Sequence, residues 1–293
     1  MKKMAKRLAA LLMSALLFLL PVGALADETA QSFTCYGDDL TSEQFQEVAK
    51  LLGTNLEQDT LIRVTIEDER ALLGGVVSSD KIGSRSLSSA RVTLTGEGSG
   101  ISVSTHNINW VTPSMYSSAL ATAGVVNASI VVAAPTSVSG TAALAGILKA
   151  YETAASAELS QEAKAAAGSE MVLTGNLGEV IGSDQAVELL AMVKKAIADY
   201  HLDDYDTLRP YVVAGAEQLG VTLSDAQIDE ITKLGVQIAK LDLDPEKLSA
   251  QLNGFIDNIQ KIQVTQQKAG AIFESIKTAV QGFFNWIGSW FKR

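Results

Sequence analysis

The chain has 293 residues, of which 47% are hydrophobic and 19% are charged. This length suffices for one large domain or two smaller ones, and the composition is that of a protein with a packed core, not of a disordered chain. The formal net charge of −10 argues against nucleic acid as a partner, because binding to phosphates requires clustered Lys and Arg. The only long apolar run stands at the start of the chain, which argues against an integral membrane protein.

The first 26 residues have the pattern of a secretory signal peptide. An apolar stretch covers residues 8–20, and Ala24-Leu25-Ala26 supplies the small residues that a signal peptidase requires. We therefore predict cleavage after Ala26 and an exported protein, either extracellular or associated with the cell envelope. The alternative is an uncleaved N-terminal anchor. The basic residues before the apolar stretch are Lys2, Lys3, Lys6 and Arg7.

Removal of the signal peptide would leave 19 Lys and Arg against 33 Asp and Glu, a net charge of −14. Cys35 is the one cysteine, so no intramolecular disulfide can form and stability must come from the core. The residues before Cys35 lack the pattern of a lipid-attachment site, which favours a role for it as a small apolar residue.

The first part of the mature chain has signals for two helices and a strand. Thr41 and Gln44 form a predicted capping box, and the helix that they begin ends at Gly53. Residues 61–65 favour a strand, after which Thr65 caps a short helix with acids in its first turn. The alternative for these acids is a metal site, which is weaker because no His or Cys stands beside them.

Two further segments alternate between apolar and polar residues, a pattern typical of half-buried strands. They cover residues 91–95 and 101–106, and a glycine-rich turn at 96–100 joins them. This pattern predicts an antiparallel β-hairpin at about 90–108 with one face of Ser and Thr.

The next segments predict a helix, a strand and a second helix. Thr112 and Pro113 favour a helix start, and Gly124 marks its end. The continuous apolar run at 128–134 predicts a strand that is buried on both faces in a central position, with Pro135 closing it. An alanine-rich helix follows, so that the order strand, strand, helix, strand, helix predicts a compact α/β unit.

The second half of the chain has signals for helices only. The predicted fold is therefore α+β: a small mixed sheet with helices, followed by a mostly helical C-terminal half. We place the α/β region at residues 27–157 and the helical region at 158–268. The residues that open the predicted helices are Ser183, Pro210, the capping box Ser224 with Gln227, and the pair Asp244-Pro245.

Residues 269–293 form the last predicted segment, an amphipathic C-terminal helix. Its apolar residues recur every three or four positions, as in helices that lie in a membrane interface. This predicts contact with a membrane or a protein partner, and the alternative is docking on the protein's own core. The residues of the apolar face are Phe273, Ile276, Val280, Phe283, Phe284, Ile287, Trp290 and Phe291.

The motifs of common enzyme classes are missing from the sequence. The chain has two His and no pair of Cys, and it has neither a phosphate-binding loop nor a Gly-x-Ser-x-Gly nucleophile elbow. We therefore expect no metal and no cofactor. A serine hydrolase is an alternative, with Ser88 or Ser139 as nucleophile. His106 would then be the base and Asp68 its orienting carboxylate, although their spacing does not favour this.

A polar region beside the predicted strands is the candidate ligand-binding surface. Arg85 is a lone cation among hydroxyl groups, which suits binding of an anion or a carboxylate. The alternatives are an ordinary Ser-rich loop and, for His106, a polar position on the open face of a strand. The candidate residues are Arg85, Ser86, Ser88, Ser89, His106 and Asn107.

Several segments contain residue patterns that resemble those of a protein family. They are residues 82–89, with Ile-Gly-x-Arg-Ser-x-Ser-Ser, and residues 100–103, 119–124, 133–135 and 138–146, with 37–41 and 64–69 in agreement. Together they resemble a family of exported proteins of Gram-positive bacteria, known as domain of unknown function 1002. The resemblance covers nearly all of the mature chain. It implies export and a Gram-positive envelope setting, and it implies no activity, cofactor or catalytic residue.

We therefore expect a secreted or envelope-associated binding or structural module rather than an enzyme. Its expected partner is an envelope component or a protein, with peripheral membrane contact through the C-terminal helix as an option. The alternative is an extracytoplasmic hydrolase that acts on an envelope polymer. A deep pocket with clustered acids and His would favour the enzyme, and a flat polar face would favour binding.

Overall fold

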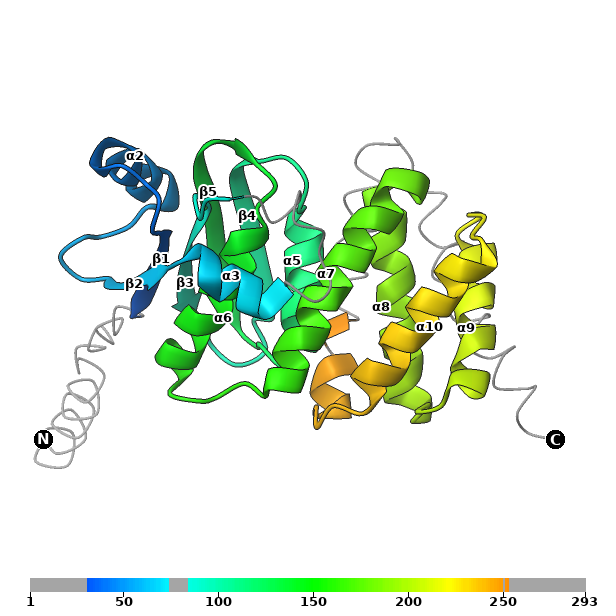
Figure 1. Ribbon diagram of the computed structural model, residues 1–293. Helices are drawn as coiled ribbons and strands as arrows, with labels where there is room; N and C mark the ends of the chain where they lie inside the picture. The colour runs from blue at the N-terminus through cyan, green and yellow to red at the C-terminus, as the bar shows by residue number, and fades with distance from the viewer. Residues whose placement is uncertain (1–30, 74–83, 250, 253–293) are drawn as a thin grey trace, which may run out of the picture. The chain divides into compact units, whose positions relative to one another are not determined.

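The structure is a computed structural model (Figure 1). It describes residues 31–73, 84–249 and 251–252. The chain divides into two compact units, Met1–Gln31 and Ser32–Arg293. The predicted signal peptide and the predicted C-terminal helix lie outside the described residues, and all described helices and strands belong to the second unit. No helix in the described part of the chain is long and apolar enough to cross a membrane.

A five-stranded mixed sheet organises the first half of the described unit. Its strands are β1 (Ser32–Gly37), β2 (Thr60–Val64), β3 (Ser89–Leu94), β4 (Ile101–Ile108) and β5 (Ala128–Val138). The strand order is β2-β1-β3-β5-β4. β1 is parallel to β2 and β4 is parallel to β5, whereas β3 is antiparallel to both of its neighbours, β1 and β5.

The antiparallel hairpin predicted at about 90–108 is wrong. β3 and β4 do not pair, because β5 lies between them. Alternation of apolar and polar residues identified both strands correctly, but it carries no information on which strands pair. β5 is apolar on both faces, so it is most stable in the middle, and a hairpin of β3 and β4 would have left it at an edge.

The central position predicted for β5 is confirmed. Ile130 and Val132 belong to the main core on one face of the sheet, and Val131 and Ala133 pack with α2 (Ser42–Leu52) on the other. The prediction that Pro135 closes this strand is wrong, because β5 continues to Val138. Its missing N–H costs no bond to β3, because β3 begins opposite Ala133.

β1 is a strand that the sequence pattern does not predict. It lies between β2 and β3, and most of its residues are buried, so the alternation that marks an exposed strand is missing. Cys35 on this strand is buried, as expected, and burial raises the pKa of its thiol to about 12. It packs against Gly146, where an added Cβ would lie 2.6 Å from the Cys35 sulfur.

Helices cover both faces of the sheet (Figure 1). α2 packs on β5, whereas α5 and α6 contribute to the main core on the opposite face. The predicted capping boxes at Thr41 and Ser224 are confirmed, as is the N-cap Thr112. The remaining helices of this half are α3 (Ile66–Leu73), α5 (Pro113–Thr122) and α6 (Thr141–Ala155).

The second half of the described unit is helical, as predicted. Its helices are α7 (Gln161–Ile181), α8 (Ser183–Tyr200), α9 (Tyr205–Gln218) and α10 (Asp225–Ala239), followed by a helical segment from residue 245. They surround a second hydrophobic core, and α7 joins the two halves because it packs against both α5 and α8.

Pro210 does not open a helix, contrary to the prediction. α9 begins at Tyr205, and the Asp204 side chain caps it by accepting from Thr207 N at 2.9 Å. Pro210 therefore lies inside the helix. The carbonyl that its missing N–H would have bonded belongs to Asp206, which is exposed and can bond to water instead.

Candidate functional site

The carboxyl ends of four strands meet at one edge of the sheet. β1, β2, β4 and β5 all run in the same direction, and the antiparallel β3 begins at this edge. We call it the carboxyl edge, and it includes residues 37–39, 63–68, 85–89 and 106–107. In sheets with parallel strands, ligands bind most often beyond the carboxyl ends.

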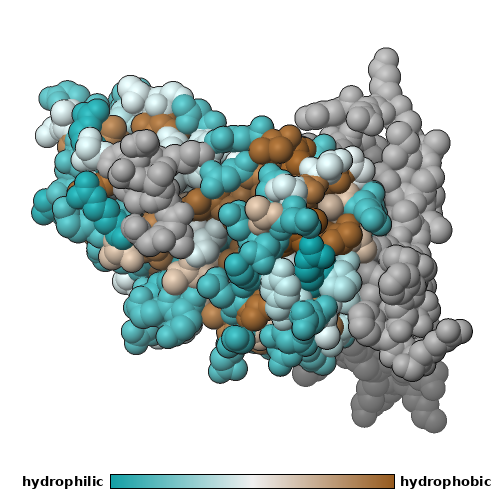
Figure 2. Space-filling view, turned by 45° about the vertical axis from the view of Figure 1, so that its right-hand side comes forward, coloured by the Kyte–Doolittle hydropathy of each residue, from teal (hydrophilic) through white to brown (hydrophobic). Residues whose placement is uncertain are grey.

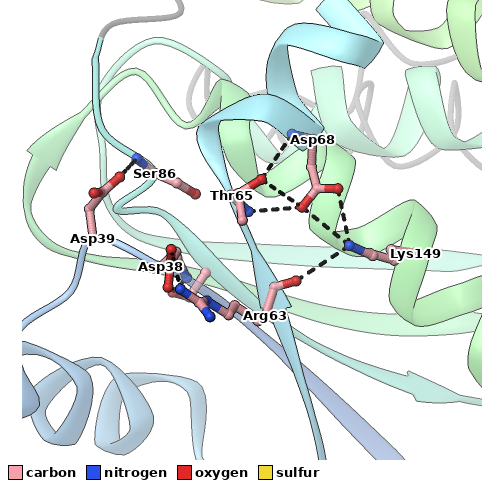
Figure 3. Close-up of polar contacts among 9 residues, drawn as sticks. Asp38, Asp39, Arg63, Thr65, Asp68, Ser86 and Lys149 are labelled. Atoms are coloured by element: carbon pink, nitrogen blue, oxygen red, sulfur yellow. Dashed lines mark hydrogen bonds and ion pairs between the residues drawn. The ribbon is translucent and has the colours of Figure 1, made fainter.

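An exposed ion pair joins the ends of β1 and β2 (Figure 3). Arg63 Nε and Nη2 donate to the two oxygens of Asp38, with an Nη2–Oδ2 distance of 2.6 Å. This contact lowers the pKa of Asp38 and raises that of Arg63. The Arg63 side chain is 62% exposed, so the pair is accessible to a ligand.

A second ion pair links the start of α3 to α6 (Figure 3). The Asp68 carboxylate accepts from Thr65 N at 2.8 Å and from Lys149 Nζ at 3.1 Å and 3.2 Å. Partial burial alone would raise the pKa of Asp68, but the bonds from Thr65 and Lys149 lower it. Thr65 Oγ1 accepts from Asp68 N in return, which confirms Thr65 as the predicted cap.

The segment before β3 is tied to the end of β1. Ser86 N donates to Asp39 Oδ2 at 2.7 Å, and Asp39 N donates to Ser86 O at 3.3 Å. Gly37 lies so close that an added Cβ would stand 2.2 Å from Ser86 O. Two of the segments that carry the family resemblance, 37–41 and 82–89, are thus in direct contact through these residues.

The serines of the predicted site lie beneath the surface that Arg85 occupies. Ser86, Ser88 and Ser89 are at most 3% exposed. Ser89 Oγ accepts from Gly37 N at 3.1 Å, and Ser86 Oγ has no hydrogen-bond partner within the ranges that the structure describes. Arg85 is exposed and forms no ion pair within the described segments. The hydroxyl groups therefore do not surround the cation.

His106 and Asn107 form a separate group at the same edge. His106 pairs with Ala133 of β5, which in turn pairs with Ser89, so one strand separates His106 from the serines. Both His106 and Asn107 are exposed, and Asn107 Nδ2 donates to Ala134 O at 2.8 Å. The structure brings all six predicted residues to one edge, in two groups.

The contacts of the described residues do not join Ser88, His106 and Asp68. Asp68 bonds to Thr65 and Lys149 and not to His106, and Ser88 is buried. Within the described ranges, no group of three or more His, Cys, Asp or Glu is placed to hold a metal ion.

Glu69 is the one strongly perturbed acid beside this edge. It is 0% exposed, and its Oε1 accepts from Thr141 Oγ1 at 2.5 Å. Its other oxygen, Oε2, is buried and has no hydrogen-bond partner in the described part of the chain. Burial raises the pKa of Glu69 to about 7, although the bond from Thr141 opposes this shift. Glu69 therefore keeps its proton to a higher pH than an ordinary glutamate does.

Four charged residues that form these contacts at or beside the edge were not among the predicted site residues: Asp38, Asp39, Arg63 and Lys149. The acids stand in a segment that carries the family resemblance, which was a usable signal. Arg63 and Lys149 have no such signal in the sequence, because their roles depend on contacts between distant parts of the chain. Asp38 and Arg63 are 25 residues apart, and Asp68 and Lys149 are 81 apart.

The edge combines balanced ion pairs with one additional cation, Arg85. The hydroxyl groups of Ser86, Ser88 and Ser89 are buried, and that of Thr65 is engaged in a helix cap. On the face shown in Figure 2, hydrophilic residues cover most of the described surface and hydrophobic ones form separate patches. An exposed guanidinium such as that of Arg85 can bind a carboxylate or a phosphate group.

Comparisons with known proteins agree with the family resemblance of the sequence. The chain is 35% identical over 277 residues to the uncharacterized protein YpuA of Bacillus subtilis (strain 168), which covers 92% of this chain and 95% of that protein. No solved structure matches significantly. The model of the family described as protein of unknown function DUF1002 matches residues 36–255, which include the whole carboxyl edge. The chain therefore belongs to the DUF1002 family.

Proposed function

We propose that this chain is an exported, envelope-associated protein that binds a carboxylate- or phosphate-bearing envelope component through its carboxyl edge. The observation that carries the proposal is Arg85, which is exposed and has no ion-pair partner among the described residues, beside the Asp38–Arg63 pair. A guanidinium recognises carboxylates and phosphates through two parallel hydrogen bonds, and the neighbouring pairs limit which ligands can approach.

Export is supported by the signal-peptide pattern of residues 1–26. The test is to express the full chain in a Gram-positive host and to sequence the N-terminus of the protein recovered from envelope and medium. We expect the mature chain to begin at Asp27, and Ala26→Glu to prevent cleavage. Recovery of the intact chain from the cytoplasm alone would contradict export.

Binding is tested by co-sedimentation of the mature protein with isolated cell-wall sacculi. We expect Arg85→Ala to reduce the bound fraction several-fold and Arg85→Lys to restore only part of it, because Lys cannot form the two-bond contact. The matched control is Lys50→Ala, which removes an exposed cation from the last turn of α2. Equal binding by Arg85→Ala and the wild type would exclude this site, and no binding by the wild type would exclude the ligand class.

The predicted amphipathic helix at 269–293 is proposed as a second contact, with a membrane or a protein partner. Sedimentation with anionic liposomes at low salt, with and without residues 271–293, tests the membrane contact. We expect only the complete chain to sediment. If both forms stay in the supernatant, the membrane contact is wrong.

A hydrolase acting on an envelope polymer was the alternative, and no contact among the described residues favours it. In the described part of the edge, Ser88, His106 and Asp68 are not joined into the nucleophile, base and carboxylate of a serine hydrolase.

A further inference from the structure

A cavity of about 500 Å³ lies at the end of the sheet opposite the carboxyl edge. It is found where β4 and β5 begin, and we call it the amino-end cavity. Cavities of this size accommodate small organic molecules. Its walls come from the turn before β4, from α5, from the turn before β5 and from the helical segment that begins at residue 245.

The turn before β4 is held in place by hydrogen bonds. Gly98 and Gly100 have φ values of 80° and 69°, which favour glycine. Asn127 Oδ1 accepts from Gly100 N at 3.1 Å, and Ala128 N donates to Gly100 O at 3.0 Å. The glycine-rich segment therefore forms a preorganised wall of the cavity instead of the predicted hairpin turn.

A buried charge network fixes the α5 side of the cavity. Ser118, which belongs to the lining, accepts from Lys194 Nζ at 2.9 Å and donates to Glu170 Oε1 at 2.5 Å. Lys194 and Glu170 are joined at 2.8 Å and are 0% and 1% exposed. Each of these groups has partners in the protein, so the network supports the wall and does not itself call for a ligand.

The side-chain amide of Gln251 is the polar group of the cavity wall that indicates a bound ligand. Its Nε2 donates to Val125 O at 3.3 Å, which sets the orientation of the amide. Its Oε1 is then buried, and no donor among the described residues bonds to it, in a residue that lines the cavity. Buried acceptors without a donor are rare in folded proteins, and a bound molecule with an N–H or O–H group would satisfy this one.

The mouth of the cavity carries opposite charges. Lys247 belongs to the lining, its side chain is 70% exposed, and among the described residues its ion-pair contact is with Asp244 at 3.6 Å. Glu97 lines the cavity from the turn before β4. The inner wall is mostly apolar, with Ile101 and Leu252 among its residues. An anionic ligand is therefore attracted by Lys247 and repelled by Glu97.

We propose that the amino-end cavity binds a small amphipathic anion. Its apolar body fills the space beside Ile101 and Leu252, an N–H or O–H group donates to Gln251 Oε1, and its anionic group pairs with Lys247. This site is separate from the carboxyl edge and does not depend on the function proposed for that edge.

The probe is 8-anilinonaphthalene-1-sulfonate, which has an apolar body, one N–H group and a sulfonate. The mature full-length protein is titrated with it and followed by ¹H–¹⁵N NMR. We expect saturable shifts of the Gly98 and Gly100 amides and of the Gln251 side-chain amide. Filling the cavity with Ala121→Leu should weaken binding about ten-fold or more, which corresponds to about 1.4 kcal/mol.

Two surface variants give effects of opposite sign. Lys247→Ala should weaken binding several-fold and Glu97→Gln should strengthen it, whereas the control Lys233→Ala, an exposed cation on α10, should change nothing. These variants decide the question if Ala121→Leu fails to fold. The proposal is overturned if the probe does not saturate, if it shifts other regions instead, or if Lys247→Ala and Glu97→Gln bind it as the wild type does.

Discussion

The two ends of the sheet differ in the solvent exposure of their ion pairs. At the carboxyl edge, the ion pairs of Arg63 and Lys149 are exposed to solvent, and Arg85 has no partner among the described residues. Beside the amino-end cavity, the charges of Lys194 and Glu170 are fully buried and fully bonded. Exposed pairs contribute little to stability and are open to ligands, whereas a buried pair is costly to break. The first end is therefore suited to recognition and the second to support.

Breaking the buried Lys194–Glu170 ion pair should have the largest effect on the stability of the protein. Glu170→Gln leaves Lys194 without a counter-charge in a site where burial already lowers the pKa of the lysine. We expect a loss of about 3–5 kcal/mol in the free energy of unfolding, measured by urea denaturation. The control is Asp229→Asn, which removes the partner of Lys233 on the surface of α10 and should have a small effect.

A double variant sharpens this prediction. Replacing both Glu170 and Lys194 by apolar residues, Glu170→Leu with Lys194→Met, removes the uncompensated charge. We expect it to be more stable than Glu170→Gln, because apolar residues of similar volume often replace a buried pair at little cost. If Glu170→Gln is as stable as the wild type, the contrast between the two ends of the sheet does not hold.

The second effect concerns Glu69 and depends on pH. The pKa of Glu69 is about 7 in the folded protein, whereas the ordinary value for glutamate is 4.5. Between about pH 4.5 and pH 7 the folded state therefore binds more protons than the unfolded state. Stability should therefore fall as the pH rises from about 4.5 to above 7, by at most about 3 kcal/mol from this group. Thr141 bonds to it, and Tyr116 and Arg70 interact with its charge.

Glu69→Gln removes this contribution. Thermal unfolding followed at several pH values should show a flatter pH dependence for the variant than for the wild type, with the largest gain above pH 7. Glu67→Gln, an exposed acid in the same helix turn, is the control. Parallel curves for Glu69→Gln and the wild type would refute the assignment.

The close approach of Gly37 to Ser86 at the carboxyl edge predicts an effect of intermediate size on stability. Gly37→Ala would place a Cβ 2.2 Å from Ser86 O and force β1 away from the segment before β3. We expect a loss of about 1–3 kcal/mol. Gly96→Ala is the control, because its nearest neighbour would be Ser99 Oγ at 4.0 Å. Equal stability of the two variants would show that this contact is not tight.

The smallest effect on stability is expected for the exposed pair at the carboxyl edge. Asp38→Asn should change the unfolding midpoint only slightly, and high salt should remove the difference. The same variant releases the Arg63 guanidinium, so sacculi should retain more of it than of the wild type. A large loss of stability would mean that this edge is structural.

Local features of the fold could be predicted from the sequence because their partners are close together. The capping box of Thr41 and Gln44 lies within four residues, and the buried run of β5 is continuous. The pairing of β5 with both β3 and β4 could not be predicted, because it depends on which buried surfaces compete for the central position.

The candidate site was predicted only in part for the same reason. Composition placed Arg85 in a polar region, and the structure confirms that it is exposed at the carboxyl edge. The sequence could not show that Ser86 and Ser89 point into the protein, nor that Lys149 reaches Asp68 from a distant helix. These facts follow from the packing of α6 and of the segment before β3 on β1.

Hydrogen exchange tests most directly whether the carboxyl edge is the binding surface. Backbone exchange is measured for the mature protein alone and in the presence of solubilised cell-wall fragments. We predict added protection in residues 37–39, 63–68 and 84–89, loss of that protection in Arg85→Ala, and no change in α9 and α10. Protection confined to other segments, or equal protection in Arg85→Ala, would contradict the account.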